Sequence, residues 1–410
     1  MSVNSDINQL LKTYKKRNVY LDHAATTPVD PAVKKAMDPY FTEEFGNPSA
    51  FYEIGLRAGE ALADARARVA KILGCSSNEI IFTGSGTESD NLAILGVARS
   101  GSHVGHIITS EIEHHAISDT VEHLKEEGFT VSFLPVDKYG LVSPSVLEKE
   151  INKRGTETIL VSVMYANNEI GTVEPIKELA AICHKKGVLF HTDACQAGGA
   201  LPINVKKLGV DLMTLNGSKI YGPKGVGCLY VRPGIKLEPI VYGGGQERGL
   251  RSGTENVPGI IGFAKALELV QKNCTSENKR LSKLRDKLTK GLTTKIPKCF
   301  LNGHPTKRLP NNVNVTILDV EGESIILFLN ELGIYASTGS ACTSKSLDPS
   351  HVITAIGLPY EAAHGSIRFT LGHSTKEADI DFVLEVMPKI VAILRKISPL
   401  NLNEKDISAR

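Results

Sequence analysis

Short apolar runs alternate with stretches of helical periodicity up to about residue 260. Residues 57–73 are predicted to form a helix that stops at Gly74, because Leu62, Ala65, Val69 and Ile72 recur at helical spacing. Residues 79–99 predict a strand, a glycine-rich turn and a helix. Further strands are expected at 106–110, 130–137, 158–166, 188–196, 212–219 and 226–232. Strands that alternate with helices imply a mostly parallel sheet covered on both faces.

The pattern changes after about residue 260. Leu281, Leu284, Leu288 and Leu292 form the apolar stripe of an amphipathic helix, and strands are expected at 311–318 and 366–372. The sequence contains neither an internal repeat nor a low-complexity linker. We therefore expect a second, smaller unit whose boundary lies near residues 260–270.

Polar residues are concentrated in the turns that follow the predicted strands. These turns have the sequences TGSGTESDN, EIEHHA, ANNEIGT, TDACQ and NGSKIYGPKG, whereas the strands before them are apolar. In open α/β sheets, ligands bind outside the carboxyl ends of the strands. We therefore expect these turns to contain the chemistry of the protein.

The composition is that of an ordinary globular protein. Hydrophobic residues make up 41% of the 410 residues and charged residues 22%, and this length corresponds to two or three domains. The net charge of +2 gives no indication of nucleic acid or an anionic membrane as a partner. No apolar run reaches the ~18 residues of a membrane helix, and the N-terminus lacks the apolar core of a secretory leader.

The cysteines indicate a reducing, cytoplasmic setting. Their number is odd, no CxxC pair occurs, and a chain of this size can bury a core without disulfides. The seven are Cys75, Cys183, Cys195, Cys228, Cys274, Cys299 and Cys342.

The glycine-rich turn TGSGTESDN is a candidate phosphate site. Gly84 and Gly86 precede a predicted helix, and the backbone N–H groups of a helix N-terminus together with the Thr87 hydroxyl suit an anion. The dinucleotide pattern GxGxxG fails because Ser89 stands at its last glycine. A capped helix start without a ligand is the alternative.

The stretch LNGSKIYGPKGVG resembles a nucleotide-binding P-loop only in its glycine spacing. Gly217 and Gly222 are correctly spaced, but Pro223 stands where the P-loop needs lysine. What remains is Lys219, directly after a strand and before a glycine-rich turn. Such a lysine is either a Schiff-base former or an ordinary surface lysine.

Two further strand ends carry candidate groups. Asp193 and Gln196 follow a strand, and Asp193 either caps the next helix or serves as the acid opposite a pyridine nitrogen. In EIEHHA, metal binding is disfavoured because no HExxH or second histidine pair occurs. We expect an imidazole of this turn, in His114, to stack on a flat ring.

The stretch STGSACTSKSLDPSH places Cys342 among small polar residues. Buried structural cysteines lie in apolar runs, as Cys228 does, whereas Cys342 is expected to be an exposed, reactive thiol on a loop.

Arg368 follows on a predicted strand. Its guanidinium either binds a carboxylate or forms a surface salt bridge.

Together, these motifs and their order resemble the cysteine desulfurase family, class V aminotransferase-type enzymes of fold-type I that use pyridoxal phosphate. The resemblance covers roughly residues 19–400. It rests on YLDHAATTPVD, TGSGTESDN, NNEIGT, HTDACQ, GSKIYGPKGVG, GGGQERGLRSGTEN and the run from GSACTSKSLDPSHV to SIRFTLG. The GSACTS and LDPSHV segments are similar to the first subgroup, which has the long cysteine loop.

The resemblance implies an α/β fold. A large cofactor-binding domain, residues 24–265, would contain a mostly parallel seven-stranded sheet flanked by helices. A smaller α+β domain, residues 1–23 and 266–410, would carry the cysteine loop.

The resemblance also implies a role for each site residue. Lys219 would hold pyridoxal 5'-phosphate as a Schiff base, and Arg368 would bind the substrate carboxylate with Asn168 nearby. Cys342 would receive sulfur from L-cysteine, leaving L-alanine. The remaining cofactor contacts would be Asp193 at the ring nitrogen, Gln196 and Asn168 near the ring oxygen, His114 on the ring face, and Gly86, Thr87, Asn216 and Ser218 at the phosphate. Thr254 would reach the phosphate in the partner of a homodimer.

One departure concerns the residues before the lysine. The family usually carries serine and histidine at the positions of Asn216 and Ser218, whereas this chain lacks an imidazole beside Lys219. Asn216 and Ser218 can still donate hydrogen bonds to a phosphate.

The sulfur acceptor stays open between an iron–sulfur scaffold protein and other carriers. A selenocysteine lyase, another β-eliminating or transaminating enzyme, and a non-catalytic sulfur carrier are the alternative functions.

Overall fold

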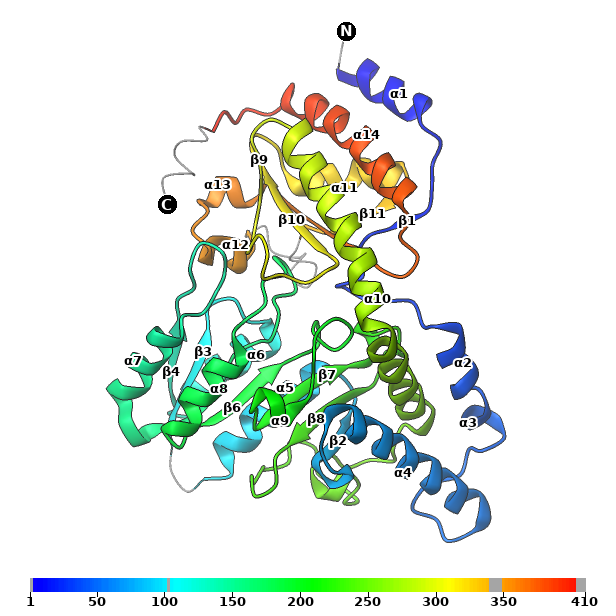
Figure 1. Cartoon of the computed structure of the whole chain (residues 1–410), viewed down its shortest axis with the longest axis vertical. Coiled ribbons are helices and arrows are strands. Elements are labelled where there is room, and N and C mark those ends of the chain that lie inside the picture. Colours follow the sequence, from blue (N-terminus) through cyan, green and yellow to red (C-terminus); the bar gives the residue numbers. More distant parts are fainter. Residues whose placement is uncertain (1–2, 102–103, 339–348, 403–410) are drawn as a thin grey trace.

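The larger part of the protein is built around a seven-stranded sheet (Figure 1). The structure is a computed structural model that describes residues 3–101, 104–338 and 349–402. The strand order is β2-β8-β7-β6-β5-β3-β4, in which β8 is antiparallel to both neighbours and the other pairs are parallel. The expected mostly parallel sheet is therefore confirmed. The strands are β2 (Ile80–Thr83), β3 (His106–Ser110), β4 (Thr130–Leu134), β5 (Thr158–Ser162), β6 (Leu189–Asp193), β7 (Leu212–Asn216) and β8 (Gly227–Val231).

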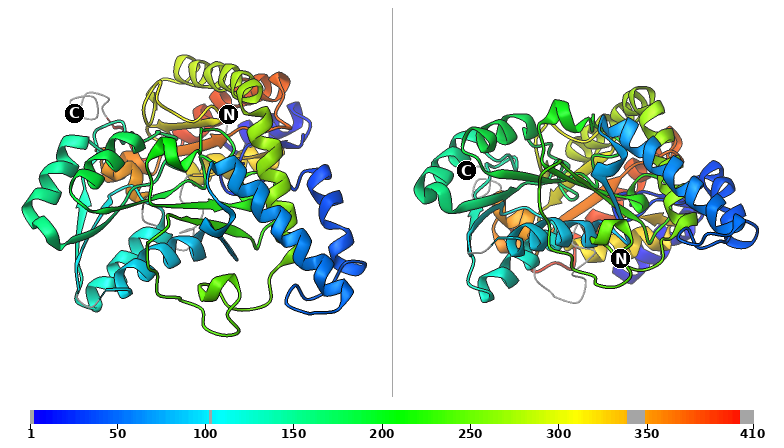
Figure 2. Two further views of the ribbon diagram at one scale, coloured as in Figure 1. Left: turned by 60° about the horizontal axis from the view of Figure 1, so that its bottom comes forward. Right: turned by 90° about the horizontal axis from the view of Figure 1, so that it is seen from below.

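Helices cover both faces of this sheet because successive strand residues point to opposite sides. Ile107 packs with α5 (Gly86–Arg99) and α6 (His115–Glu126), which lie on one face (Figure 2, left, cyan). Its neighbour Ile108 packs into the core of the other face. The helices of that core are α4 (Glu53–Leu73), α7 (Pro144–Arg154), α8 (Ile176–Lys185) and the first half of α10 (Val257–Lys295).

A second unit surrounds a three-stranded antiparallel sheet. Its central strand is β10 (Asn312–Ile317), with β9 (Cys299–Leu301) and β12 (Ser366–Thr370) on either side. The apolar faces of α11 (Gly322–Glu331) and α14 (Glu377–Arg395) share a separate core with these strands. The chain start joins this unit through α1 (Val3–Thr13) and β1 (Val19–Tyr20), which pairs in parallel with β11 (Ile334–Tyr335).

Helix α10 connects the two cores. Its early residues Ile260 and Phe263 belong to the core of the large sheet, whereas Leu284 and Leu288 belong to the core of the smaller unit. The expected leucine stripe is therefore buried as predicted. The division into two domains stays a prediction, and the distribution of buried side chains supports a division within α10.

The shorter elements complete the connections between these parts. They are α2 (Pro31–Met37), α3 (Pro39–Thr42), η1 (Ser77–Glu79), η2 (Gly155–Glu157), α9 (Val205–Leu208), η3 (Gly217–Lys219), η4 (Glu247–Gly249), α12 (His351–Ala355) and α13 (Tyr360–Ala363).

Several predicted strands are shorter in the structure than expected: those over 130–137, 188–196 and 212–219 end at Leu134, Asp193 and Asn216. The strand over residues 158–166 ends at Ser162. The side chain of Asn167 explains the turn that follows, because its Oδ1 accepts hydrogen bonds from the backbone N–H groups of Glu169 and Ile170.

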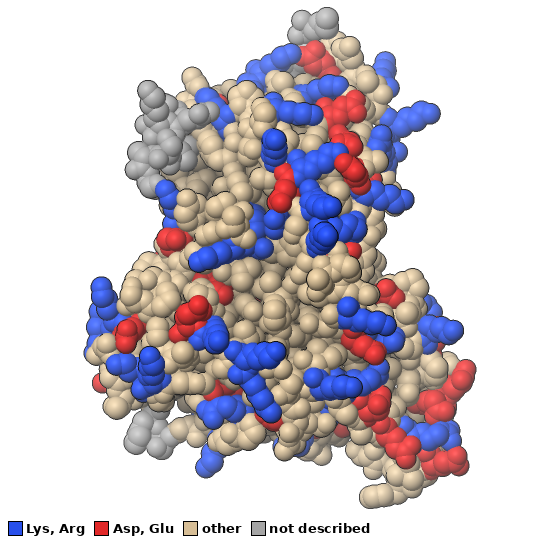
Figure 3. Space-filling model, in the orientation of Figure 1, with Lys and Arg blue, Asp and Glu red and all other residues tan. Residues whose placement is uncertain are grey.

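The visible surface carries charges of both signs. Lysine and arginine are interspersed with aspartate and glutamate across this face rather than gathered in one stretch (Figure 3). No helix in the described part of the chain is both long enough and apolar enough to cross a membrane.

Candidate active site

Five strand ends meet at one edge of the large sheet, where a cavity of about 410 Å³ opens. The parallel direction of β3, β5, β6 and β7 brings their following turns together, and β2 runs the same way. The predicted residues that line this cavity are Gly86, Thr87, His114, Asn168, Asp193, Gln196, Asn216, Lys219 and Arg368. Among the other predictions, Ser218 and Thr254 do not line it, and Cys342 lies outside the described residues.

Lys219 extends from the η3 turn after β7. Its Nζ donates hydrogen bonds to the backbone carbonyls of Ala24 and Ala25, at 2.9 and 2.5 Å. The turn requires glycine at 217, since a Cβ there would lie 2.7 Å from the carbonyl oxygen of Pro223. Tyr221 follows with a left-handed backbone (φ 62°), an unusual conformation for a residue with a side chain. The glycines near Lys219 therefore shape a tight turn that directs the amine to the segment after β1.

The start of α5 forms one end of the cavity. Ser85 caps this helix, its side chain accepting from the backbone N–H of Glu88. A Cβ on Gly86 would lie 2.7 Å from Sγ of Cys195, so only glycine fits without displacement. The backbone N–H groups of Gly86 and Thr87 donate to no described residue. This end of the cavity is therefore suited to an anion.

Asp193 ends β6 and faces the cavity from the centre of the sheet. Its Oδ1 accepts a hydrogen bond from the backbone N–H of Cys195, at 2.8 Å, which fixes the carboxylate. Burial and the negative charge of Asp193 raise the pKa of the Cys195 thiol. Cys195 is therefore kept protonated and unreactive although it lines the cavity.

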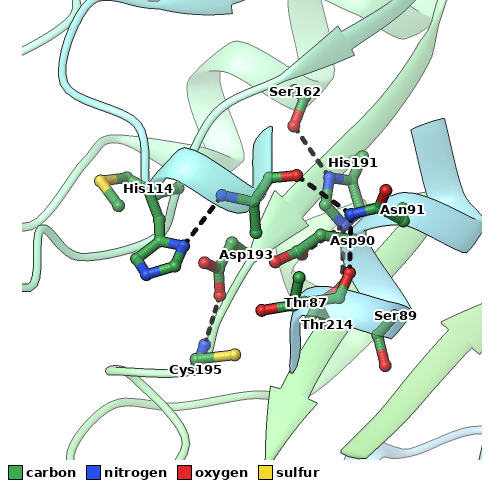
Figure 4. Close-up of polar contacts among 12 residues, drawn as sticks. Thr87, Ser89, Asp90, Asn91, His114, Ser162, His191, Asp193, Cys195 and Thr214 are labelled. Carbon is green, nitrogen blue, oxygen red and sulfur yellow. Dashed lines mark hydrogen bonds and ion pairs between the residues drawn. The ribbon is translucent and has the colours of Figure 1, made fainter. Parts of the chain in front are cut away.

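A second buried carboxyl lies beside Asp193 (Figure 4). Asp90, from α5, is almost completely buried, and its Oδ1 lies 3.7 Å from Nε2 of His191 on β6. Burial, and next the charge of Asp193, raise the pKa of Asp90 well above its usual value. Burial lowers the pKa of His191 to about 4. His191 is therefore neutral near pH 7, and burial favours the protonated form of Asp90.

His114 is the N-cap of α6. Its Nδ1 accepts a hydrogen bond from the backbone N–H of Ala116, at 3.0 Å (Figure 4). Burial lowers the pKa of the imidazole. The ring is therefore neutral, and its proton is carried on Nε2.

Arg368 comes from β12 of the smaller unit and is only 2% exposed. Its Nη1 donates to the backbone carbonyl of Asn168, at 3.0 Å, and its Nη2 to the carboxylate of Asp22, at 2.8 Å. Gln196 reaches the same segment, since its Nε2 donates to the carbonyl of Ala24, at 3.0 Å. The cavity is thus closed by residues from both units.

The residues that flank the cysteine segment are fixed beside this cavity. On one side, Ser337 exchanges two backbone hydrogen bonds with Arg368. On the other, the hydroxyl of Ser350 donates to Glu169 at 2.5 Å, and His351 Nε2 is bonded to the carbonyl of Glu113 at 2.9 Å. The described residues on the two sides of Cys342 are therefore bonded to Arg368, which lines the cavity, and to the chain neighbours of the lining residues Asn168 and His114.

Thr254 is exposed and lies outside the cavity of its own chain. Ion pairs hold its segment against the body of the protein: Arg251 pairs with Glu88 at 2.9 Å, and Glu247 with Arg66 at 2.6 Å. The predicted role of Thr254 in a partner's site stays a prediction.

Comparison with known proteins identifies the family. Residues 19–383 match the family model of aminotransferase class-V. The chain is 55% identical over 391 residues to cysteine desulfurase IscS of Methanosarcina thermophila, which covers 95% of this chain and 96% of the relative. This chain belongs to the cysteine desulfurase family.

Solved structures agree with membership of the cysteine desulfurase family and with the fold-type I architecture. The chain superposes on a NifS-like protein with a TM-score of 0.86 and 38% identity, covering 92% of this chain and 100% of the other. A structure described as SspA in complex with cysteine matches with a TM-score of 0.74 and 35% identity, over 86% of this chain and 99% of the other.

The cavity of this cysteine desulfurase family member fits pyridoxal phosphate, the cofactor of the class. An amine, a carboxylate and a neutral imidazole converge on it from Lys219, Asp193 and His114. The space over Gly86, which a Cβ would fill, lies beside free backbone donors suited to a phosphate. Within the described ranges, no group of three or more histidine, cysteine, aspartate or glutamate residues could hold a metal ion.

Four residues of this family site escaped the sequence analysis. Asp22, Asp90, His191 and Cys195 all stand inside the motifs that were recognised, but no role was assigned to them. His191 could have been found, since it lies two residues before Asp193 and so shares its face of β6. Asp22 could not, because its partner Arg368 is 346 residues away along the chain.

Proposed function

We propose that this chain is a pyridoxal-phosphate-dependent cysteine desulfurase, which converts L-cysteine to L-alanine and leaves the sulfur as a persulfide on Cys342. The observation that carries the proposal is the convergence of Lys219, Asp193 and Arg368 on one cavity. Ser337, five residues before Cys342 in the sequence, pairs with the cavity-lining residue Arg368. The substrate follows from the relatives, among which is a complex with cysteine.

The cofactor would be held at both ends of the cavity. Lys219 would bind its aldehyde carbon and Asp193 its ring nitrogen, while the phosphate would lie at the start of α5. The remaining contacts would be His114 on the ring face, Asn168 and Gln196 at the ring oxygen, and Gly86, Thr87 and Asn216 at the phosphate. When bound, pyridoxal phosphate supplies an electron-withdrawing ring that stabilises negative charge at the substrate α-carbon.

The side chains of this protein then perform three tasks. Arg368 binds the substrate carboxylate through the part of its guanidinium that faces the cavity. The Nζ of Lys219 removes the proton from the α-carbon, and the carbonyls of Ala24 and Ala25 position this amine. Burial lowers the pKa of His114, so this residue presents a neutral imidazole at the cavity.

Cys342 completes the sulfur transfer. Its thiolate attacks the sulfur of the substrate, so that an S–S bond forms while the Cβ–S bond breaks and its electron pair stays with carbon. Protonation of that carbon gives alanine, and Cys342 retains the persulfide. The sulfur has neither been released nor oxidised by an outside reagent, which suits delivery to an acceptor protein such as an iron–sulfur scaffold.

We propose that the active form is a homodimer. Large apolar side chains are exposed between residues 41 and 56, where a monomer would leave them in water: Phe41, Phe45, Phe51, Tyr52 and Leu56. Thr254 is exposed and free to serve a neighbouring chain. Light scattering on the purified protein tests this, and a monomer at micromolar concentration would contradict it.

We further propose a reducing, cytoplasmic compartment. All six cysteines in the described part of the chain are free, and four of them are buried in positions that pair with no second cysteine. The four are Cys183, Cys195, Cys228 and Cys299.

The test of the activity is to supply L-cysteine and to measure alanine and, with a thiol reductant, sulfide. We expect equal amounts of both products from the wild type and no alanine from Lys219→Ala. Alanine formation from selenocysteine but not from cysteine would favour a selenocysteine lyase. A purified protein that binds no pyridoxal phosphate would favour a non-catalytic sulfur carrier.

A further inference from the structure

Ser218 touches Asn216 rather than the cavity. The Ser218 hydroxyl and the Ser218 backbone N–H both donate to Oδ1 of Asn216, at 3.2 and 3.1 Å. Asn216 lines the cavity and Ser218 does not. We infer that Ser218 is a positioning residue, which acts on the cofactor phosphate through the amide of Asn216. This inference rests on the proposed function.

The two hydrogen bonds decide which way the amide of Asn216 points. A backbone N–H can only donate, so the atom that faces Ser218 must be the oxygen of the carboxamide. The nitrogen then faces the other way, toward the start of α5. An ideal Cβ on Gly86 would lie 3.3 Å from Nδ2 of Asn216, which places this donor at the phosphate end of the cavity. Nδ2 itself donates to no described residue.

The sheet explains why Asn216 and the start of α5 are neighbours. In the register, Gly227 of β8 lies between Asn216 of β7 and Thr83 of β2. A Cβ on Gly227 would lie 2.4 Å from the carbonyl oxygen of Ser85. Glycine at this position therefore lets the cap of α5 approach the end of β7. Three hydrogen-bond donors therefore lie close together at the start of α5: the backbone N–H groups of Gly86 and Thr87 and the side-chain amide of Asn216.

The role of Ser218 thus differs from that of a direct phosphate ligand. Without the hydroxyl of Ser218, Oδ1 of Asn216 would keep only its hydrogen bond from the backbone N–H of Ser218. The carboxamide of Asn216 would then have more freedom to turn. Loss of the hydroxyl should weaken the hold on the phosphate and leave the hold on the pyridine ring unchanged. The effect should also require the side chain of Asn216.

The experiment measures equilibrium binding of pyridoxal phosphate, and separately of pyridoxal, to the apoprotein by fluorescence quenching. The variants are Ser218→Ala, Asn216→Ala and the double substitution, with Ser218→Thr as the variant that keeps a hydroxyl. We expect Ser218→Ala to weaken pyridoxal phosphate binding ~5- to 10-fold, the effect of one hydrogen bond. Pyridoxal binding should stay within about twofold, and Ser218→Thr should retain most of the affinity. In the Asn216→Ala background, removal of Ser218 should have no further effect.

Several results would overturn this role of Ser218. An equal loss in the Asn216→Ala background would show that Ser218 acts independently of Asn216. An equal loss for pyridoxal would show a general disturbance of the Lys219 turn. An unchanged affinity of Ser218→Ala, with normal wild-type binding, would remove the role and leave the proposed function standing. A wild type that binds no pyridoxal phosphate would remove both.

Discussion

Arg368 and Asp22 form an ion pair of 2.8 Å that joins the smaller unit to the segment after β1. Arg368 is buried and Asp22 is partly buried, and Arg368 also donates to the carbonyl of Asn168. A guanidinium can bind a carboxylate, a carbonyl and a substrate at once because its N–H donors are fixed in a planar fork. The residue expected to recognise the substrate is thus already oriented before any substrate arrives.

Arg368→Lys should therefore impair substrate binding. A lysine has one nitrogen on a flexible stem and cannot serve Asp22, Asn168 and a carboxylate together. We expect the KM for L-cysteine to rise by roughly 10- to 100-fold, with a smaller change in kcat. Steady-state alanine formation measures both constants. The bound cofactor should keep its absorbance, and an unchanged KM would contradict the role of Arg368.

Gly86→Ala should weaken cofactor binding through a steric conflict. The added Cβ would lie 2.7 Å from Sγ of Cys195 and 3.3 Å from Nδ2 of Asn216. Overpacking of this kind costs about 1–3 kcal/mol, so the affinity for pyridoxal phosphate should fall at least several-fold. Combining it with Cys195→Ala removes the closest contact and should restore part of the affinity. No difference between the single and double variants would show that the sulfur is not the obstacle.

Glu174 should make the stability of the apoprotein depend on pH. Burial raises its pKa from about 4.5 to about 8. The folded protein therefore holds a proton that the unfolded chain has lost, so the contribution of Glu174 to stability falls as pH rises between these values. In the wild type, the free energy of unfolding should fall as pH rises. Glu174→Gln should make this decrease less steep by about 1.4 kcal/mol per pH unit between pH 6.5 and 7.5. Urea unfolding at several pH values measures this slope.

The pH range and a matched variant make this test specific. The lowered pKa of His191 affects stability only below about pH 6.5, because this ring is neutral in both states above it. Glu113, whose pKa is also raised to about 8, and Asp90, whose pKa is raised by burial, should leave a residual slope in Glu174→Gln. Glu178 is exposed nearby and serves as control. If Glu178→Gln changed the slope as much as Glu174→Gln, the buried carboxyl would not be its cause.

Lys219→Ala should abolish the absorbance of the bound cofactor near ~420 nm, which the wild type is expected to show when purified. The variant loses the amine that joins the aldehyde, whereas Asp193 and the phosphate end of the cavity stay intact. The test is to add pyridoxal phosphate to the apoprotein of the wild type and of Lys219→Ala and to record the absorbance spectrum of each. The same absorbance in both proteins would assign the covalent link to another residue.

The sequence was sufficient to predict local features but not long-range pairings. The strand His106–Ser110 agrees with its prediction because its apolar run is short and bounded by polar residues. The polar turns converge as expected, since parallel strands end at one edge. The pairing of Asp22 with Arg368 and the burial of Asp90 beside Asp193 depend on how distant segments pack, which periodicity does not encode. The direction of β8 also required the structure.

The role of Ser218 could not be predicted from the sequence either, although its neighbours in the chain decide it. Its position before Lys219 and its hydroxyl suggested a phosphate contact, and the residue type alone agrees with that role. Which of two neighbouring polar side chains faces the cavity depends on the η3 turn. Asn216 occupies that place, and Ser218 lies behind it.

The transfer of sulfur from L-cysteine to Cys342 is the central claim, and one labelling experiment tests it most directly. The protein loaded with pyridoxal phosphate is treated with L-[35S]cysteine, freed of small thiols, digested and analysed by mass spectrometry, alongside Cys342→Ala and Lys219→Ala. We predict one reducible sulfur on the peptide that contains Cys342 for each alanine formed in a single turnover, and no label in either variant. Alanine formed by Cys342→Ala at the wild-type rate, or label on another cysteine of the wild type, would contradict the account.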